Sequence, residues 1–182
     1  RTGAFELLYL ESQRPAKQTL VALTSADLVT WARRDALVYD LAHGAPFIVS
    51  PAAIEHAGKT YLFYVETEAH ALRVMVSDDG QRWDWHQARP VELALGPIKP
   101  WHVDVIAGDG AFALLISGYD QEFIHQRLYL ATSPDLERWT LAPAPLLDYA
   151  DPALDLVSLY RSTGVVDHGA LIVWYSMQYR PR

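Results

Sequence analysis

The richest concentration of chemically capable side chains is the segment KPWHVDV, which runs from Lys99 to Val105. Its Trp101, His102 and Asp104 supply an aromatic face, an imidazole and a carboxylate within four residues. A tryptophan can stack on a sugar ring, a histidine can hydrogen-bond hydroxyls, and an aspartate can transfer a proton. On a strand, His102 and Asp104 point to one face because side chains alternate with period two. The alternative is a packed tryptophan beside a His–Asp pair that holds a loop.

Other acids and hydrogen-bonding residues stand at comparable places in the chain. Asp104, Asp155 and Glu66 are the candidates for catalytic carboxylates. The candidates for substrate binding carry a ring or a hydrogen-bonding group: Trp101, His102, Tyr160, Arg161 and Asp120. Arg161 either binds a substrate group or pairs with an acid across the site. Asp155 lies in a proline-rich loop, where ordinary solvation of its carboxylate is the alternative.

The sequence lacks the residues that several other kinds of catalysis and binding require. The chain has no cysteine, which excludes disulfides and thiol catalysis but does not fix the compartment. The seven histidines are scattered without HxH or HExxH spacing, so no metal or other cofactor is predicted, and a structural cation such as calcium in a central channel stays open. The sequence contains no GxSxG elbow and no glycine-rich phosphate loop.

Composition narrows the class of partner. The net charge is -7 and no basic stripe exists, which argues against nucleic acid. No run of 18 apolar residues could span a membrane, and the first residues, RTGAFELLYL, do not read as a signal peptide, so the location is left open. Six tryptophans and ten tyrosines suit a packed β core and sugar binding equally well. We therefore expect a carbohydrate partner.

A repeat reveals the elements that must position these residues. The string TSADLVTW at Thr24–Trp31 returns as VSDDGQRW at Val76–Trp83 and as TSPDLERW at Thr132–Trp139. The three serines are 52 and 56 residues apart. A second string, GKTYLFY, GAFALLI and GALIVWY, recurs in step at spacings of 52 and 59 residues. Two motifs that share one period predict a single structural unit repeated along the chain.

Each repeat is predicted to hold four short strands. In the second repeat they are residues 47–56, 60–67, 72–77 and 82–87, which are rich in β-branched or aromatic residues and bounded by Gly, Asp or Pro. A four-stranded unit that recurs every ~50 residues is typical of a propeller blade. The predicted fold class is therefore all-β, a β-propeller of four-stranded antiparallel blades.

We interpret the SxDxxxW string as structural. Its aspartate falls in the turn between the third and fourth strands, where a carboxylate can accept hydrogen bonds from backbone amides. Gly80 can take a positive φ there. The tryptophan begins the outer strand and is expected to pack against its own blade or the neighbouring one. A catalytic residue is rarely needed three times at equivalent places, so these residues are expected to build the fold.

The strand count falls short of a closed propeller. The chain supplies a partial blade at 5–38, blades at 46–88 and 100–141, and a partial blade at 155–179. These hold thirteen strands, about three and a quarter blades, whereas propellers close with four to eight. An open propeller leaves two unpaired sheet edges. We therefore expect residues 1–182 to form one incomplete domain that a missing segment or a partner chain completes.

Strand direction places the candidate residues together. Strands alternate within a blade, so the start of the first strand and the end of the second share one face. With the loops that link the blades, this rule assigns the following candidates to one mouth of the central channel: Ser50, Trp101, His102, Asp104, Asp155, Tyr160, Arg161, Glu66, Glu68, Tyr119, Asp120, His43, Asp148 and Asp151.

Three long segments resemble one enzyme group over nearly the whole chain. SPAAIEHAGKTYLFYVET, KPWHVDVIAGDGAFALLIS with LYLATSPDLERW after it, and SLYRSTGVVDHGALIVWYS resemble the five-bladed propellers of glycoside hydrolase family 43 and related families 32, 62, 68 and 130. The resemblance implies five blades and hydrolysis of a polysaccharide or oligosaccharide, such as a furanoside, by carboxylate acid–base catalysis. The alternative is a non-catalytic carbohydrate-binding or scaffold propeller.

The acids of that family are not carried over residue by residue. The matching positions, at a set distance before the glycine strings, hold Ser50 and Pro51, Trp101 and His102, and Tyr160 and Arg161. Asp104 is therefore a substitute candidate beside the second of these positions. The Asp-box of sialidase-type propellers is a weaker match, because it is one residue longer and its enzymes need several arginines.

Overall fold

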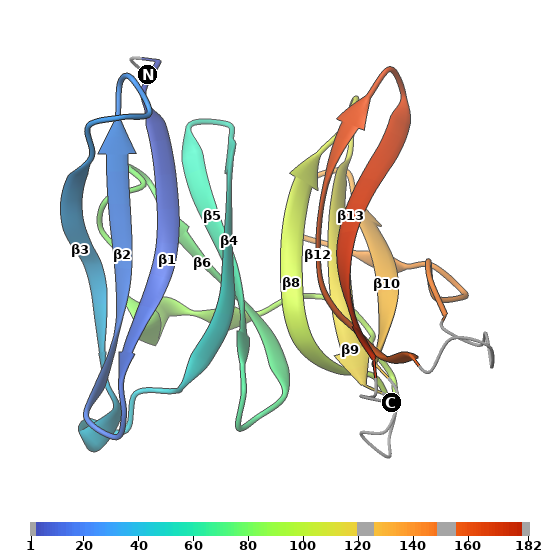
Figure 1. The fold of residues 1–182 in the computed structure, drawn as a ribbon, viewed down its shortest axis with the longest axis horizontal. Helices are drawn as coiled ribbons and strands as arrows, with labels where there is room; N and C mark the ends of the chain where they lie inside the picture. The colour runs from blue at the N-terminus through green and yellow to red at the C-terminus, as the bar shows by residue number, and fades with distance from the viewer. Residues whose placement is uncertain (1–2, 120–125, 149–155, 180–182) are drawn as a thin grey trace.

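The protein is almost entirely β-structure. The computed structural model describes residues 3–119, 126–148 and 156–179. These residues form thirteen strands and two short 3-10 helices, and the groups of strands stand side by side (Figure 1). Within the described residues, no helix is long and apolar enough to cross a membrane. The all-β, mostly antiparallel fold class predicted from the repeat is confirmed.

The strands fall into groups of three, four, four and two along the chain. The first sheet holds β1 (Phe5–Gln13), β2 (Lys17–Ser25) and β3 (Ala32–Asp40). After the 3-10 helix η1 (Leu41–His43), the second sheet holds β4 (Ile48–His56), β5 (Lys59–Glu66), β6 (Ala71–Ser77) and β7 (Arg89–Pro90). The next four strands are β8 (Lys99–Ala107), β9 (Phe112–Tyr119), β10 (Gln126–Ser133) and β11 (Thr140–Leu141). The last two, β12 (Leu156–Asp167) and β13 (Ala170–Tyr179), form a hairpin. A parallel contact between β12 and β10 joins this hairpin to the preceding four strands in the six-stranded third sheet.

One predicted strand is wrong. Strands β4, β5 and β6 lie within one residue of their predicted bounds, but residues 82–87 are not a strand. They lead into the 3-10 helix η2 (Trp85–Gln87), which Asp84 caps by accepting a hydrogen bond from the His86 N–H at 3.0 Å. The outer strand β7 comes later and stays two residues long, and its Pro90 has no N–H to donate to a sheet.

The core lies between the sheets, because the second strand of each full sheet is buried on both faces. In β5, Tyr61, Phe63 and Val65 pack into the core shared with the third sheet. The alternate residues Leu62 and Tyr64 pack into the core shared with the first sheet. This two-sided burial explains why these strands read as continuous apolar runs in the sequence. Blade therefore packs on blade, as a propeller requires.

The serine and aspartate of the SxDxxxW turns bond as predicted, whereas of the tryptophans Trp139 is buried, Trp31 is exposed and Trp83 does not begin a strand. In the third copy, Asp135 Oδ1 accepts hydrogen bonds from the N–H groups of Glu137 and Arg138 at 2.9 and 3.1 Å. Ser133 Oγ accepts one from the Leu136 N–H at 2.9 Å. Equivalent bonds hold the other two copies, and the residue after the aspartate has a positive φ in each: Leu28 62°, Gly80 67° and Leu136 65°. Backbone N–H donors also lower the pKa of Asp79 to about 2.

Two buried glutamines join neighbouring blades. Gln18, at the start of β2, donates from Nε2 to the Ile48 carbonyl at 2.8 Å and accepts from the Ile48 N–H at 3.0 Å. Gln126, at the start of β10, accepts at 2.7 Å from the hydroxyl of Ser158, its parallel partner on β12. Each glutamine therefore fixes the first strand of the next group, which carries candidate site residues.

Replacing Gln18 by Met is expected to lower the free energy of unfolding by about 1–3 kcal/mol, because it leaves buried backbone groups of Ile48 without their partners. Urea unfolding followed by tryptophan fluorescence measures the loss. The matched control is Gln13→Met, at an exposed position in β1, with an expected change within about 0.5 kcal/mol. Equal midpoints for the two variants would show that Gln18 does not join the blades energetically.

The outer strands are unpaired on one side. In the ranges the structure describes, β1 pairs only with β2 and β13 only with β12. Large side chains of β13 are exposed: Ile172, Trp174, Tyr175 and Met177. An edge of this kind invites another strand or sheet. We propose that a missing segment or a partner chain covers this edge. That the chain forms one domain also stays a prediction.

Candidate functional site

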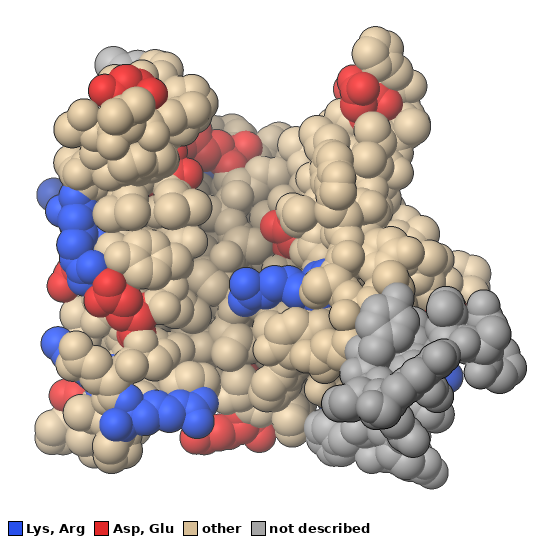
Figure 2. All heavy atoms as spheres, in the orientation of Figure 1, with Lys and Arg blue, Asp and Glu red and all other residues tan. Residues whose placement is uncertain are grey.

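A pocket of about 440 Å³ lies where one strand from each group converges, and its walls come from β1, β4, β8 and β12. Figure 2 shows the surface hollowed between β1 and β12, with acidic and basic atoms at the walls. Five of the residues predicted for the channel mouth line this pocket: Ser50, His102, Asp104, Tyr160 and Arg161. We refer to it as the central pocket.

The first strand of each of the last three groups has a β-bulge at a corresponding place. The pairing register slips between Val49 and Ala52 in β4, between Pro100 and His102 in β8, and between Leu159 and Arg161 in β12. Bulges interrupt the alternation of side chains and re-aim them. As a result, consecutive residues of one strand face the central pocket, among them 48–51, 102–104 and 160–163.

The bulge in β4 brings Ser50 onto His102. Ser50 has a positive φ of 54°, and its Oγ lies 2.5 Å from His102 Nδ1. Both residues are buried, and His102 Nε2 has no hydrogen-bond partner among the described residues. Burial, with the nearby charge of Arg161, lowers the pKa of His102 to about 4. The imidazole is therefore neutral at pH 7 and too weak a base to activate Ser50, so the pair fixes a neutral hydrogen-bonding ring.

Asp104 is the carboxylate of the central pocket. The Thr163 hydroxyl donates to its Oδ2 at 2.7 Å, and the Val105 N–H donates to its Oδ1 at 3.0 Å. These bonds oppose the effect of burial, but desolvation is the larger influence and raises the pKa of Asp104. The side chain therefore holds its proton to a higher pH than an exposed aspartate does.

Aromatic rings and a guanidinium complete this wall. The Tyr160 ring meets the His102 ring edge to face, with centroids 4.6 Å apart. Arg161 is exposed at the pocket, and its backbone N–H is fixed by Ser176 Oγ at 3.2 Å. Trp101 makes edge contacts with the rings of His102 and Tyr119, both at 6.1 Å, outside the residues that line the pocket. Its role in stacking on a sugar stays a prediction.

The structure does not bring all the predicted acids together. Glu66 lines a different pocket, where its Oε2 accepts a hydrogen bond from Arg73 Nε at 2.8 Å. Asp120 and Asp155 lie outside the described residues. Among the described residues no group of three or more His, Asp or Glu could hold a metal ion, so the channel cation stays a prediction.

Sequence reasoning missed the partners of the candidate residues. Thr163, which holds Asp104, follows Arg161 by two residues, so the period of a strand could have placed both on one face. Tyr9 and Ser12 line the central pocket from β1. No chemical motif surrounds either residue, and only the folded arrangement of β1 beside β4 identifies them.

Comparison with known proteins gives a fold likeness only. No family model matches the chain, and no curated protein matches its sequence. An N-acetylgalactosamine deacetylase from F. plautii is 18% identical with a TM-score of 0.81, over 96% of this chain and 59% of that one. An α-L-arabinanase from Penicillium chrysogenum is 16% identical with a TM-score of 0.68, over 94% and 53% of the two chains.

A GH32 β-fructofuranosidase from Bombyx mori is 18% identical with a TM-score of 0.68, over 99% of this chain and 40% of that one. This chain thus spans between 40% and 59% of the length of these three structures. Several of the solved structures similar to it are glycoside hydrolases that share the five-bladed propeller. The chain therefore has the β-propeller fold of the glycoside hydrolases of families 43, 32 and 130, as the sequence motifs led us to expect.

Proposed function

We propose that the central pocket binds a carbohydrate and that the protein hydrolyses a glycosidic bond with Asp104 as the general acid. The observation that carries the proposal is the desolvated Asp104 carboxyl, with its raised pKa, in the wall of a pocket of about 440 Å³. General acids of glycosidases are carboxyl groups whose pKa is raised in this way. The folds of the similar structures, many of them enzymes named for sugar substrates, support it.

Each lining residue has a task in this reaction. Protonated Asp104 gives its proton to the glycosidic oxygen as the bond from that oxygen to the sugar carbon breaks. The guanidinium of Arg161, exposed at the pocket, donates hydrogen bonds to sugar hydroxyls, and neutral His102 holds Ser50 in the pocket wall. A second carboxylate, about 5–9.5 Å from the first, must take the nucleophile or base role and bring in water. Our candidate is Asp155, which directly precedes β12 in the sequence.

A second candidate function is carbohydrate binding without cleavage. One observation favours it: among the described residues that line the central pocket, Asp104 is the only carboxylate. A glycosidase that lacked the second acid would bind sugar and leave the bond intact. The two functions differ in turnover and agree in binding, so both quantities must be measured.

The test uses the protein with two sets of sugars. Aryl furanosides and pyranosides report hydrolysis by released phenol, and arabino- and fructo-oligosaccharides of two to six units report it by chromatography of products. Titration calorimetry measures binding of the same oligosaccharides. Turnover supports the enzyme, binding without turnover moves the assignment to a carbohydrate-binding propeller, and neither from a folded protein rejects the central pocket as a sugar site.

The rate of hydrolysis is expected to fall as pH rises through the raised pKa of Asp104, because only the protonated acid can donate. Since the Thr163 hydroxyl lowers that pKa, Thr163→Val should move the falling limb to higher pH. Thr163→Ser keeps the hydroxyl and should leave the limb in place. The profile of kcat/KM against pH decides, and a limb that all three proteins share would assign it to another group.

A further inference from the structure

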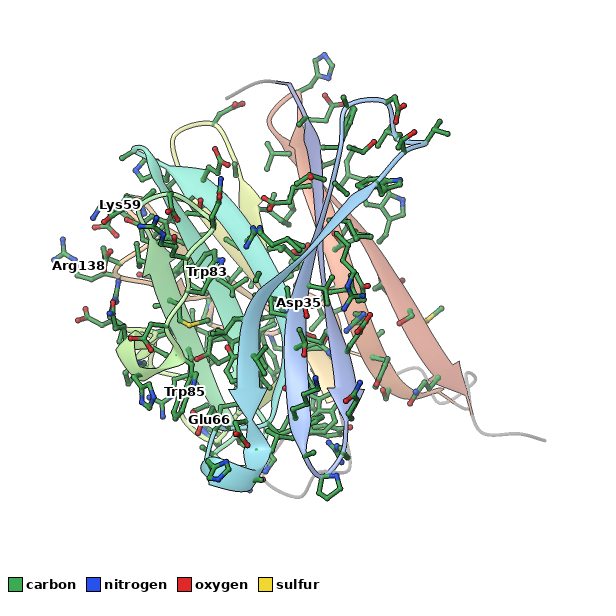
Figure 3. The ribbon with its side chains drawn as sticks, turned by 90° about the vertical axis from the view of Figure 1, so that its left-hand side faces the viewer. Asp35, Lys59, Glu66, Trp83, Trp85 and Arg138 are labelled. Carbon is green, nitrogen blue, oxygen red and sulfur yellow. The ribbon has the colours of Figure 1, made fainter. Side chains whose placement is uncertain are left out.

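A second and larger pocket opens between the first and second sheets. Its volume is about 840 Å³, within the range of about 300–1,000 Å³ usual for small-molecule sites. The residues of its wall that carry the argument are Arg14, Phe47, Glu66, Arg73, Trp85 and His86. Figure 3 shows Glu66 and Trp85 close to one another at one end of the second sheet. We refer to it as the lateral pocket.

The walls of the lateral pocket combine flat rings with paired charges. Trp85 and His86 stack with ring centroids 3.7 Å apart and planes 29° from parallel. The guanidinium carbon of Arg14 lies 3.6 Å from the centre of the Phe47 ring. Such rings offer a flat apolar surface with hydrogen-bonding groups at its rim. The C–H face of a sugar ring can pack on that surface while the sugar hydroxyls bond to the groups at the rim.

The charges of the lateral pocket favour a neutral ligand. Glu66 and Arg73 are bonded to each other at 2.8 Å, and both side chains are partly buried. Arg14 and Glu68 add one charge of each sign, so the four charged side chains sum to zero. A strongly anionic or cationic ligand would meet one repulsive charge for each attractive one, whereas hydroxyl groups can bond to both.

The lateral and central pockets meet at one residue. Phe47 lines both of them, directly before β4 and its bulge at Ser50. Its carbonyl accepts hydrogen bonds from the N–H and the hydroxyl of Thr67, both at 3.0 Å. The two pockets are therefore adjacent at a residue whose backbone is held in place, so sugar units bound in them can belong to one chain.

We infer that the lateral pocket is a distal subsite that holds further units of a neutral oligosaccharide whose reacting bond lies in the central pocket. The inference rests on the proposed function and adds the substrate class: a neutral chain of several sugar units. It also gives Glu66 a different task from the catalytic one predicted for it, namely to bind hydroxyls together with Arg73.

The test is the dependence of binding and hydrolysis on chain length. In Trp85→Ala and in Arg14→Gln, the preference for a hexasaccharide over a disaccharide of the arabino- and fructo-series should fall about tenfold, since contacts to rings and charged groups are lost. Arg14 is exposed, so its variant keeps the test open even if loss of Trp85 disturbs folding. Trp31→Ala, at an exposed tryptophan of the first sheet, is the matched control and should keep the preference.

The outcomes separate the two proposals. A protein that binds or cleaves both lengths, with the same preference in all three variants, overturns the lateral subsite and leaves the central pocket in place. A wild-type protein without preference for the longer chain overturns it as well. A folded protein that neither binds nor cleaves any member of the two series overturns the proposed function, and the subsite with it.

Discussion

Substitution of Asp104 by Asn is expected to lower kcat/KM for hydrolysis by about 10²–10⁴-fold, the usual contribution of a general acid. The amide has nearly the same shape as the protonated acid. Its oxygen can accept the hydrogen bond from the Val105 N–H, and its NH2 group can donate to the Thr163 hydroxyl oxygen. What it lacks is the proton that the leaving oxygen requires. Because those bonds can persist, binding of an uncleaved oligosaccharide should stay close to that of the wild type.

The matched control for this prediction is Asp109→Asn, at an exposed turn just beyond the end of β8. It makes the same chemical change away from the central pocket and should keep the wild-type rate. The rate of hydrolysis of an aryl glycoside, compared with the affinity measured by calorimetry, separates a loss of catalysis from a loss of binding. An Asp104→Asn variant with the wild-type rate would retain the enzyme and discard Asp104 as its acid.

The second large effect concerns stability. Trp139→Ala is expected to lower the free energy of unfolding by about 3–5 kcal/mol, the cost of removing a large buried aromatic side chain. Trp139 is 6% exposed, and its ring meets Phe63 of the neighbouring sheet at 5.6 Å and 86°. Its indole N–H also donates to the Leu136 carbonyl at 3.3 Å. The loss therefore removes a contact between blades as well as one within the turn.

Trp31→Ala serves as the comparison, because the same motif places Trp31 at an exposed site. Trp31 is 36% exposed and makes the matching bond from its indole N–H to the Leu28 carbonyl at 3.2 Å. A surface position of this kind should lose no more than about 1 kcal/mol. Unfolding in urea gives both values. Equal losses in the two variants would mean that the turn, and not the packing between sheets, sets the stabilising effect.

The turns were predictable because their interactions are local. Every hydrogen bond of Asp135 and Ser133 in the third turn joins residues no more than three apart, so the string itself contains the donors and acceptors. The buried second strands were equally predictable, since both faces of β5 pack into cores and its sequence is therefore largely apolar. Local chemistry and the period together therefore predicted the propeller.

The outer strand of the second blade was not predictable by the same means. Trp83 and Trp85 alternate with polar residues, which is the pattern of a half-buried strand. The competing interaction is the hydrogen bond from the His86 N–H to Asp84, which favours the 3-10 helix. Two alternating aromatic residues favour a strand less strongly than the capping hydrogen bond of Asp84 favours the 3-10 helix.

The sequence predicted where the site residues lie but not which residues they bond to. His102, Asp104 and Arg161 were placed at the channel because the blades repeat, and all three line the central pocket. The bonds that define their environment, from Ser50 to His102 and from Thr163 to Asp104, join residues 52 and 59 apart. These separations are one blade each, so no local pattern contains both partners. The bulges also break the alternation on which strand-face arguments depend.

The bulges of β4, β8 and β12 have a consequence for how such a protein can evolve. Duplication of a blade copies the bulge, and the copied position stands outside the hydrogen-bonded ladder that the sheet needs to fold. A mutation there leaves the pairing of the strands untouched, and at Ser50 or Tyr160 it also changes the lining of the central pocket. Ser50, Trp101 and Tyr160 occupy the three bulges, and each is a different residue type. A lineage can thus exchange one chemistry for another, or give chemistry up, while it inherits the same scaffold.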